Sequence, residues 1–101
     1  MKKQQLQSEN SNSELKTSKM ELILFNDDVN SFDFVIECLI EVCEHEPEQA
    51  EQCAITAHFK GKCGIKSGSL NELAPMNNEL NSRGISTILA WFIVINYAQV
   101  L

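Results

Sequence analysis

The chain has 101 residues, with 8 basic against 14 acidic side chains and a formal net charge of −6. This length suits one domain with a single modest core. The acidic balance, with no basic cluster beyond Lys2 and Lys3, argues against a protein that binds the phosphate backbone of nucleic acid. The N-terminus lacks the charged, apolar and small-residue layout of a secretory signal, so we expect a cytoplasmic protein.

The first segment, residues 1–19, is polar and shows no periodicity. Such a segment cannot bury enough apolar surface to offset the entropy of ordering, so we interpret it as a flexible N-terminal arm. We expect the folded domain over residues 20–90. It opens with a short apolar run over residues 20–25, which predicts a strand covered by helices.

Two helices are predicted after this strand. Asn30 or Ser31 can cap the first, and apolar residues between 32 and 42 recur at helical spacing. Pro47 suits the first turn of the second helix, and Gly61 suits its end.

The apolar stripe of this second helix contains Ala54 and Ala57 and, at the same spacing, His58. A histidine on such a stripe is commonly a core residue bonded to a nearby carbonyl. The pattern alone therefore leaves open a purely structural role for His58.

A strand, a third helix and a last strand are predicted in the rest of the domain. Residues 62–66 predict a short strand, and Ser69 with Glu72 forms a capping box ahead of a third helix that Gly84 can end. Pro75 lies well inside this helix and is expected to kink it or delay its start. A β-prone run over residues 85–95 follows. The order β-α-α-β-α-β predicts an α+β fold, a two-layer sandwich with a three-stranded, mainly antiparallel sheet.

The last residues, 91–101, form an atypical hydrophobic tail. The apolar stretch is well below the roughly 20 residues that a helix needs to cross a bilayer, so we expect no membrane association. An extended strand, a self-association edge and a late frame change are alternative explanations of this tail.

The four cysteines show no CxxC pair, and in a reducing cytosol they are expected to stay as thiols in or near the core: Cys38, Cys43, Cys53 and Cys63. A zinc site that recruits His45 or His58 is the alternative. Because zinc ligands usually come in short-spaced pairs, we expect no metal and no cofactor.

The stretch LILFNDD, residues 22–28, ends an apolar run abruptly in one amide and two carboxylates. Asn and Asp side chains bond their own backbone and so favour turns and helix starts. The same three groups can also form an acceptor-rich site for a cationic ligand.

The stretch LILFNDDVNSFDFVIECLIEV, followed about one helix later by AHFKGK, resembles the ClpS family over roughly residues 21–89. Members are adaptors that hand N-degron substrates to a Clp-type AAA+ unfoldase and its peptidase. The resemblance implies a non-enzymatic protein whose partners are this unfoldase and proteins with Leu, Phe, Tyr or Trp at the N-terminus. We expect a monomer with neither nucleic-acid nor membrane partners.

The resemblance also implies roles for single residues. Asn26, Asp27 and a neutral His58 would surround the substrate α-ammonium, which has three donors, while Asp28 would shape the turn and offer backbone groups to the first peptide unit. The first side chain would enter a hydrophobic pocket formed by Leu24, Asn30, Phe32, Val35, Ala54 and Ala57. The two alanines stand where many members have larger residues, which predicts a roomier pocket.

Two other functions stay open at this point. Asp27, Asp28 and His58 could bind a metal that activates water, as in a metal-dependent hydrolase. Alternatively, the same fold could be a protein-docking module in which NDD is only a capped turn.

Overall fold

The computed structural model describes residues 18–93. In chain order the elements are β1 (Ser18–Phe25), α2 (Phe32–Cys43), α3 (Pro47–Lys60), β2 (Lys62–Gly68), α4 (Leu70–Ser82) and β3 (Thr87–Ile93). The predicted α+β class and element order are confirmed. Residues 1–17 of the predicted arm and residues 94–101 of the predicted tail lie outside the described part of the chain.

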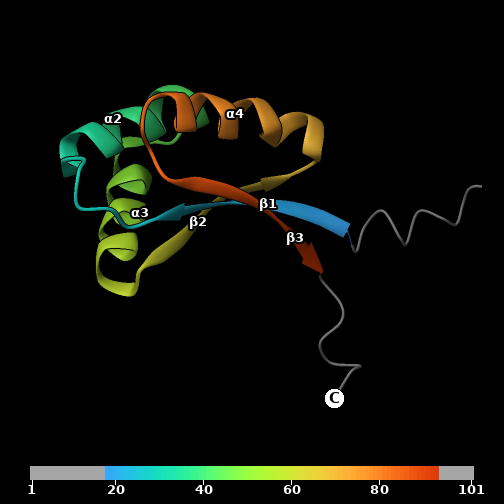
Figure 1. Cartoon of the computed structure of the whole chain (residues 1–101), viewed down its shortest axis with the longest axis horizontal. Coiled ribbons are helices and arrows are strands. Elements are labelled where there is room, and N and C mark those ends of the chain that lie inside the picture. The colour runs from blue at the N-terminus through green and yellow to red at the C-terminus, as the bar shows by residue number, and fades with distance from the viewer. Residues whose placement is uncertain (1–17, 94–101) are drawn as a thin grey trace, which may run out of the picture.

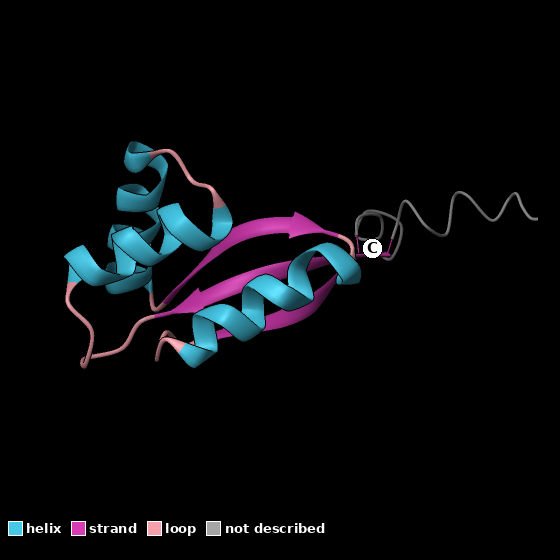
Figure 2. Ribbon diagram, turned by 90° about the horizontal axis from the view of Figure 1, so that it is seen from above, coloured by secondary structure: helices cyan, strands magenta, loops and turns pink. Residues whose placement is uncertain are grey.

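The three strands form one antiparallel sheet in the order β2-β1-β3, with a register shift between Leu22 and Ile23 where β1 pairs with β2. Helix α4 lies along the sheet against β1 and β3, whereas α2 and α3 gather at the end of the sheet where β1 stops (Figure 1). The view from above shows the same division (Figure 2). The chain that leaves β1 therefore enters a corner between the sheet and two helices.

The core lies between the sheet and the helices. Alternate residues of β1 (Met20, Leu22 and Leu24) are buried, because successive side chains of a strand point to opposite faces. The largest fully buried side chains come from β1, α2, α4 and the link before β3: Leu22, Leu39, Leu73, Leu80, Ile85, Cys38 and Cys43. All four cysteines are free thiols, with Cys53 and Cys63 half-buried beside this core.

Local signals set the helix boundaries where the sequence predicted them. The hydroxyl oxygens of Ser31 and Ser69 accept hydrogen bonds from the backbone N–H three residues on, at 3.1 and 3.2 Å. Helix α3 begins at Pro47, and after Lys60 it is capped by Gly61, whose φ of +94° is the left-handed conformation that favours glycine. These signals fix the two ends of α3, which carries three of the ten residues predicted for the site: Ala54, Ala57 and His58.

Several boundaries differ from the prediction. Strand β1 begins at Ser18, two residues before the expected boundary, and β2 continues to Gly68, because both segments pair with neighbouring strands. β3 begins at Thr87 rather than at residue 85, since the Ile85 N–H still donates to the Leu80 carbonyl at 2.9 Å.

Pro75 was expected to kink the third helix or to delay its start; the start is not delayed, because α4 begins at Leu70 and continues through Pro75. Proline removes one hydrogen bond from the helix. The Ser69 cap before Pro75, and the buried side chains of Leu73 and Leu80 on either side of it, stabilise the helix despite this loss. Among the described residues, no helix has the length and apolar character needed to cross a membrane.

Candidate functional site

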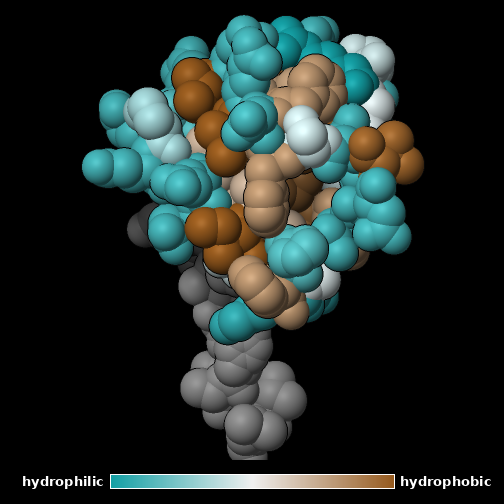
Figure 3. All heavy atoms as spheres, turned by 90° about the vertical axis from the view of Figure 1, so that its left-hand side faces the viewer, coloured by the Kyte–Doolittle hydropathy of each residue, from teal (hydrophilic) through white to brown (hydrophobic). Residues whose placement is uncertain are grey.

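A cavity of about 270 Å³ opens at the end of the sheet where α2 and α3 gather. Figure 3 views this end of the molecule, where apolar and hydrophilic side chains alternate around a hollow. Every residue predicted for the site lines the cavity, together with Phe25, which the sequence did not single out: Leu24, Phe25, Asn26, Asp27, Asp28, Asn30, Phe32, Val35, Ala54, Ala57 and His58.

The apolar side of the cavity comes from β1, α2 and α3. Leu24, Ala54 and Ala57 are all at least 96% buried, and Val35 packs against the core beside them. Because alanine side chains end at Cβ, α3 leaves open the space that larger residues would fill. A cavity of about 150 Å³ already holds a benzene molecule, so the volume here can hold an aromatic side chain.

The polar side of the cavity is the loop between β1 and α2, and Asp27 organises it. Its Oδ1 accepts hydrogen bonds from the backbone N–H groups of Val29 (2.9 Å) and Asn30 (2.8 Å), and its Oδ2 accepts one from Asn30 Nδ2 (3.0 Å). Burial acts to raise the pKa of the Asp27 carboxyl, but these hydrogen bonds outweigh it and lower the pKa below the usual 3.8. Asp27 is therefore an ionised acceptor held in one orientation.

This assignment differs from the sequence prediction for the turn. Asp28 was expected to shape the turn, yet the hydrogen bonds that do so belong to Asp27. Within residues 18–93 the Asp28 side chain makes no hydrogen bond, and it remains exposed at the edge of the cavity.

The loop is also anchored at its ends. The backbone N–H of Phe25 donates to the Ser86 carbonyl at 2.9 Å, and that of Asn26 donates to the Gly61 carbonyl at 3.0 Å. We call this loop between β1 and α2, residues 26–31, the acceptor loop. The second bond ties it to Gly61, which caps α3 three positions after His58. Asn26 and His58 are thereby held at the same cavity by the backbone.

His58 is exposed near the end of α3 and has no hydrogen-bond partner within the described residues. Its ring instead lies edge-on to two phenylalanines. The centroid distance is 5.3 Å to Phe32, with an interplanar angle of 68°, and 4.9 Å to Phe59, with an angle of 82°. The core-histidine alternative is therefore wrong for His58.

That alternative describes His45 instead. His45 is 5% exposed, and its Nε2 lies 2.8 Å from the carbonyl oxygen of Ile65 on β2. This role could not be predicted from the sequence, because His45 lies in the short link between α2 and α3, where no periodicity applies.

Among residues 18–93, no group of three His, Cys, Asp or Glu side chains is arranged to hold a metal ion. Asp27, Asp28 and His58 line the cavity without forming such a group. What the cavity does combine is an apolar interior, an oriented carboxylate and an accessible imidazole.

Residues 15–86 match the sequence pattern of the family described as "ATP-dependent Clp protease adaptor protein ClpS". The chain belongs to the ClpS family. The resemblance seen in the NDD stretch and in AHFKGK is thus confirmed, and the match covers the loop, both cavity helices and α4.

Curated relatives named ATP-dependent Clp protease adapter protein ClpS support this membership. The Escherichia fergusonii protein is 35% identical over 65 residues, which are 60% of this chain and 61% of that protein. The Erwinia tasmaniensis protein is 35% identical over 72 residues, 68% of each chain. The Cronobacter sakazakii protein is 35% identical over 57 residues, 54% of each chain. The chain thus spans less than two thirds of the Escherichia and Cronobacter proteins.

The solved structure of Agrobacterium tumefaciens ClpS2 bound to L-phenylalaninamide is similar in fold to this chain. Its TM-score is 0.63 at 16% sequence identity, and the match covers 74% of this chain and 98% of that chain. At this identity the likeness shows that the ClpS fold is shared.

Proposed function

We propose that this chain is an adaptor that binds proteins bearing a bulky hydrophobic N-terminal residue and delivers them to a Clp-type AAA+ unfoldase. It acts by binding and carries out no chemistry itself. The observation that carries the proposal is the composition of one cavity, which joins a buried apolar interior to oriented hydrogen-bond acceptors at its mouth.

The acceptors suit a free chain terminus. An α-ammonium group has three donors and a positive charge, and the side-chain carbonyl of Asn26, the carboxylate of Asp27 and a neutral imidazole of His58 can accept from it. Three hydrogen bonds within the loop already engage Asp27, so at most about one of its roughly four acceptor sites is left for a ligand. An internal peptide bond has one donor, no charge and chain on both sides, so it cannot substitute.

The apolar interior suits the first side chain of such a terminus. Burial of a Phe, Leu, Tyr or Trp side chain against Leu24, Ala54 and Ala57 contributes about 2–3 kcal/mol. The Agrobacterium ClpS2 ligand, L-phenylalaninamide, has the same two features, a free α-amino group and a benzyl side chain. This ligand supports the proposal as an analogy from a relative.

Adaptor function needs a second contact, with the unfoldase, and we assign it to the predicted N-terminal arm, of which residues 1–17 precede β1. Because β1 begins at Ser18, the arm can be removed up to residue 16 without cutting the sheet. Deletion of residues 1–16 should leave peptide binding intact and abolish degradation of an N-degron substrate by the unfoldase and peptidase in the cytoplasm. Loss of peptide binding would show that the arm belongs to the fold.

The decisive experiment compares a short peptide that starts with Phe with its Nα-acetylated twin, by calorimetric titration. We expect binding of the free peptide and none of the acetylated one, because acetylation removes the charge and two donors. The docking-module alternative expects neither peptide to bind. A hydrolase would release amino acids from the peptide during incubation, which chromatography would detect.

A further inference from the structure

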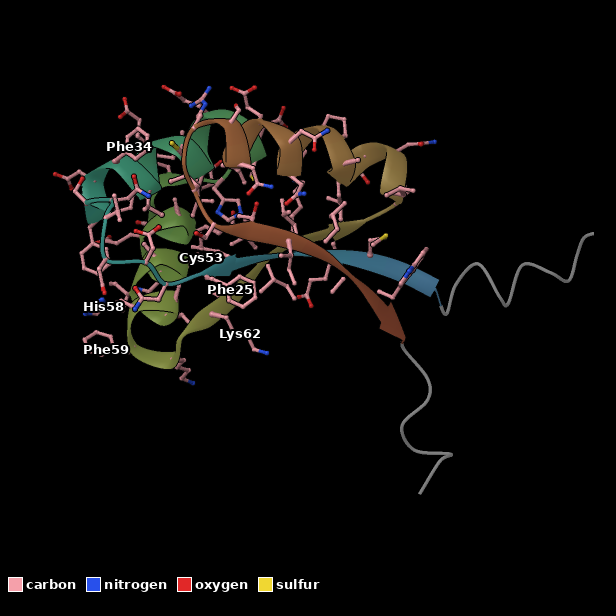
Figure 4. The ribbon with its side chains drawn as sticks, in the orientation of Figure 1. Phe25, Phe34, Cys53, His58, Phe59 and Lys62 are labelled. Carbon is pink, nitrogen blue, oxygen red and sulfur yellow. The ribbon has the colours of Figure 1, made fainter. Side chains whose placement is uncertain are left out.

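Phe59 is a large apolar side chain that is 77% exposed, directly after His58 at the end of α3. Together with Phe32, which is 45% exposed at the start of α2, it brackets the His58 ring. Figure 4 shows His58 and Phe59 side by side at this end of α3. We call Phe32, His58 and Phe59 the aromatic row.

The aromatic row continues the cavity outward. Phe32 and His58 line the cavity, whereas Phe59 lies one ring beyond them and outside it. A ring this exposed gains little from burial, since the hydrophobic effect contributes about 25 cal/mol per Å² removed from water. Val29, 88% exposed on the acceptor loop, adds a second apolar side chain near the mouth. Exposed apolar groups that gather beside a binding cavity mark a contact surface.

The second residue of a substrate bound in the cavity would lie at the cavity mouth, where Phe59 and Val29 are exposed. If the first residue fills the cavity with its ammonium beside His58, the Cα of the second residue lies about 3.8 Å farther along the chain. Successive side chains of an extended chain point to opposite sides. The second side chain is then directed away from the cavity, and the Phe59 ring, whose centroid lies 4.9 Å from that of His58, is an apolar group outside the cavity that it can contact.

We propose that Phe59 forms a subsite for the second residue of the substrate and makes this adaptor prefer N-degrons with a large apolar residue at that position. This inference rests on the proposed recognition of a free N-terminal residue and deepens it. Phe59 acts by direct contact with the second side chain, in addition to its edge-on contact with His58.

The test uses two peptides that differ only at the second position, Phe-Leu and Phe-Ser with the same remainder, and three proteins. These are the unaltered chain, Phe59→Ala and the matched control Phe34→Ala. Phe34 is 37% exposed on α2 and lies on the side of that helix away from His58 (Figure 4). We expect the unaltered chain and Phe34→Ala to bind the Phe-Leu peptide about fivefold more tightly than the Phe-Ser peptide. Phe59→Ala should bind both peptides equally.

Other outcomes distinguish a failure of the Phe59 subsite from a failure of the proposed N-terminal recognition. Equal binding of both peptides by the unaltered chain, or a preference that survives in Phe59→Ala, overturns the subsite while leaving N-terminal recognition in place. If Phe59→Ala weakens both peptides by the same factor, Phe59 only positions His58 and the subsite is again overturned. If neither peptide binds the unaltered chain, the proposed function fails and the subsite fails with it.

Discussion

The two histidines of this chain lie in opposite environments. His45 is buried in the link between α2 and α3 and its Nε2 is bonded to the Ile65 carbonyl, whereas His58 is exposed at the cavity between two phenylalanine rings. Through Nε2, His45 joins the link between α2 and α3 to β2, so this hydrogen bond serves the fold. Both ring nitrogens of His58 lack a partner within the described residues, so its capacity is available to a ligand. The position at the end of α3, and not the residue type, separates the two roles.

The largest expected effect comes from removing the exposed histidine. His58→Ala should weaken binding of a Phe-starting peptide by about 1.5–3 kcal/mol, the range for a hydrogen bond to a charged group. Its free energy of unfolding should change by less than about 0.5 kcal/mol, as for most surface substitutions. Calorimetric titration and urea unfolding measure the two quantities. An unchanged affinity would mean that His58 does not contact the ligand.

The buried histidine should show the reverse pattern. His45→Ala should lower the free energy of unfolding by about 1–3 kcal/mol, because the buried Ile65 carbonyl loses its donor. The folded protein should keep its peptide affinity. His45→Gln, which can still donate to the carbonyl, serves as the control and should lose less stability. If both His45 variants are as stable as the unaltered chain, the hydrogen bond to Ile65 contributes nothing to the fold.

The smallest expected effect concerns Asp27, which serves both the loop and the proposed ligand. Its pKa is lowered in the folded protein, so its contribution to stability is present above the ordinary value of 3.8 and is lost as the pH falls through the lowered value. Asp27→Asn should reduce the free energy of unfolding by about 0.5–1 kcal/mol at pH 7, because this side chain is partly solvated. The difference should shrink below pH 4. Asp28→Asn is the matched control and should have no effect on stability at either pH.

Much of this fold could be predicted because its signals are local. Ser31, Pro47, Gly61 and Ser69 act on the backbone within a few residues of themselves, and each marks a boundary that the structure has. The extra residues of β1 and β2 could not be predicted in this way. Their strand conformation depends on pairing partners far along the chain, such as Gly68 opposite Met20.

The members of the cavity were predictable from family resemblance, whereas their surroundings were not. Helical periodicity placed His58 on the same stripe as Ala54 and Ala57, yet both alanines are buried and His58 is exposed, since a stripe does not reveal where the covering layer ends. Phe59 was missed for a related reason. It lies off the apolar stripe and does not line the cavity, and its relation to the site rests on its position next to His58 and on the edge-on contact of the two rings.

Asn30 carries a consequence for how the cavity moves. The two hydrogens of its side-chain amide go to Asp27 Oδ2 at 3.0 Å and to the Gly84 carbonyl at 2.9 Å, so one group spans two loops that are 54 residues apart. Opening of the turn after α4 breaks one of these bonds and loosens the other. The acceptor loop and that turn therefore form one cooperative opening unit, and the backbone amides of Val29 and Asn30 should exchange with solvent deuterium together and faster in Asn30→Ala.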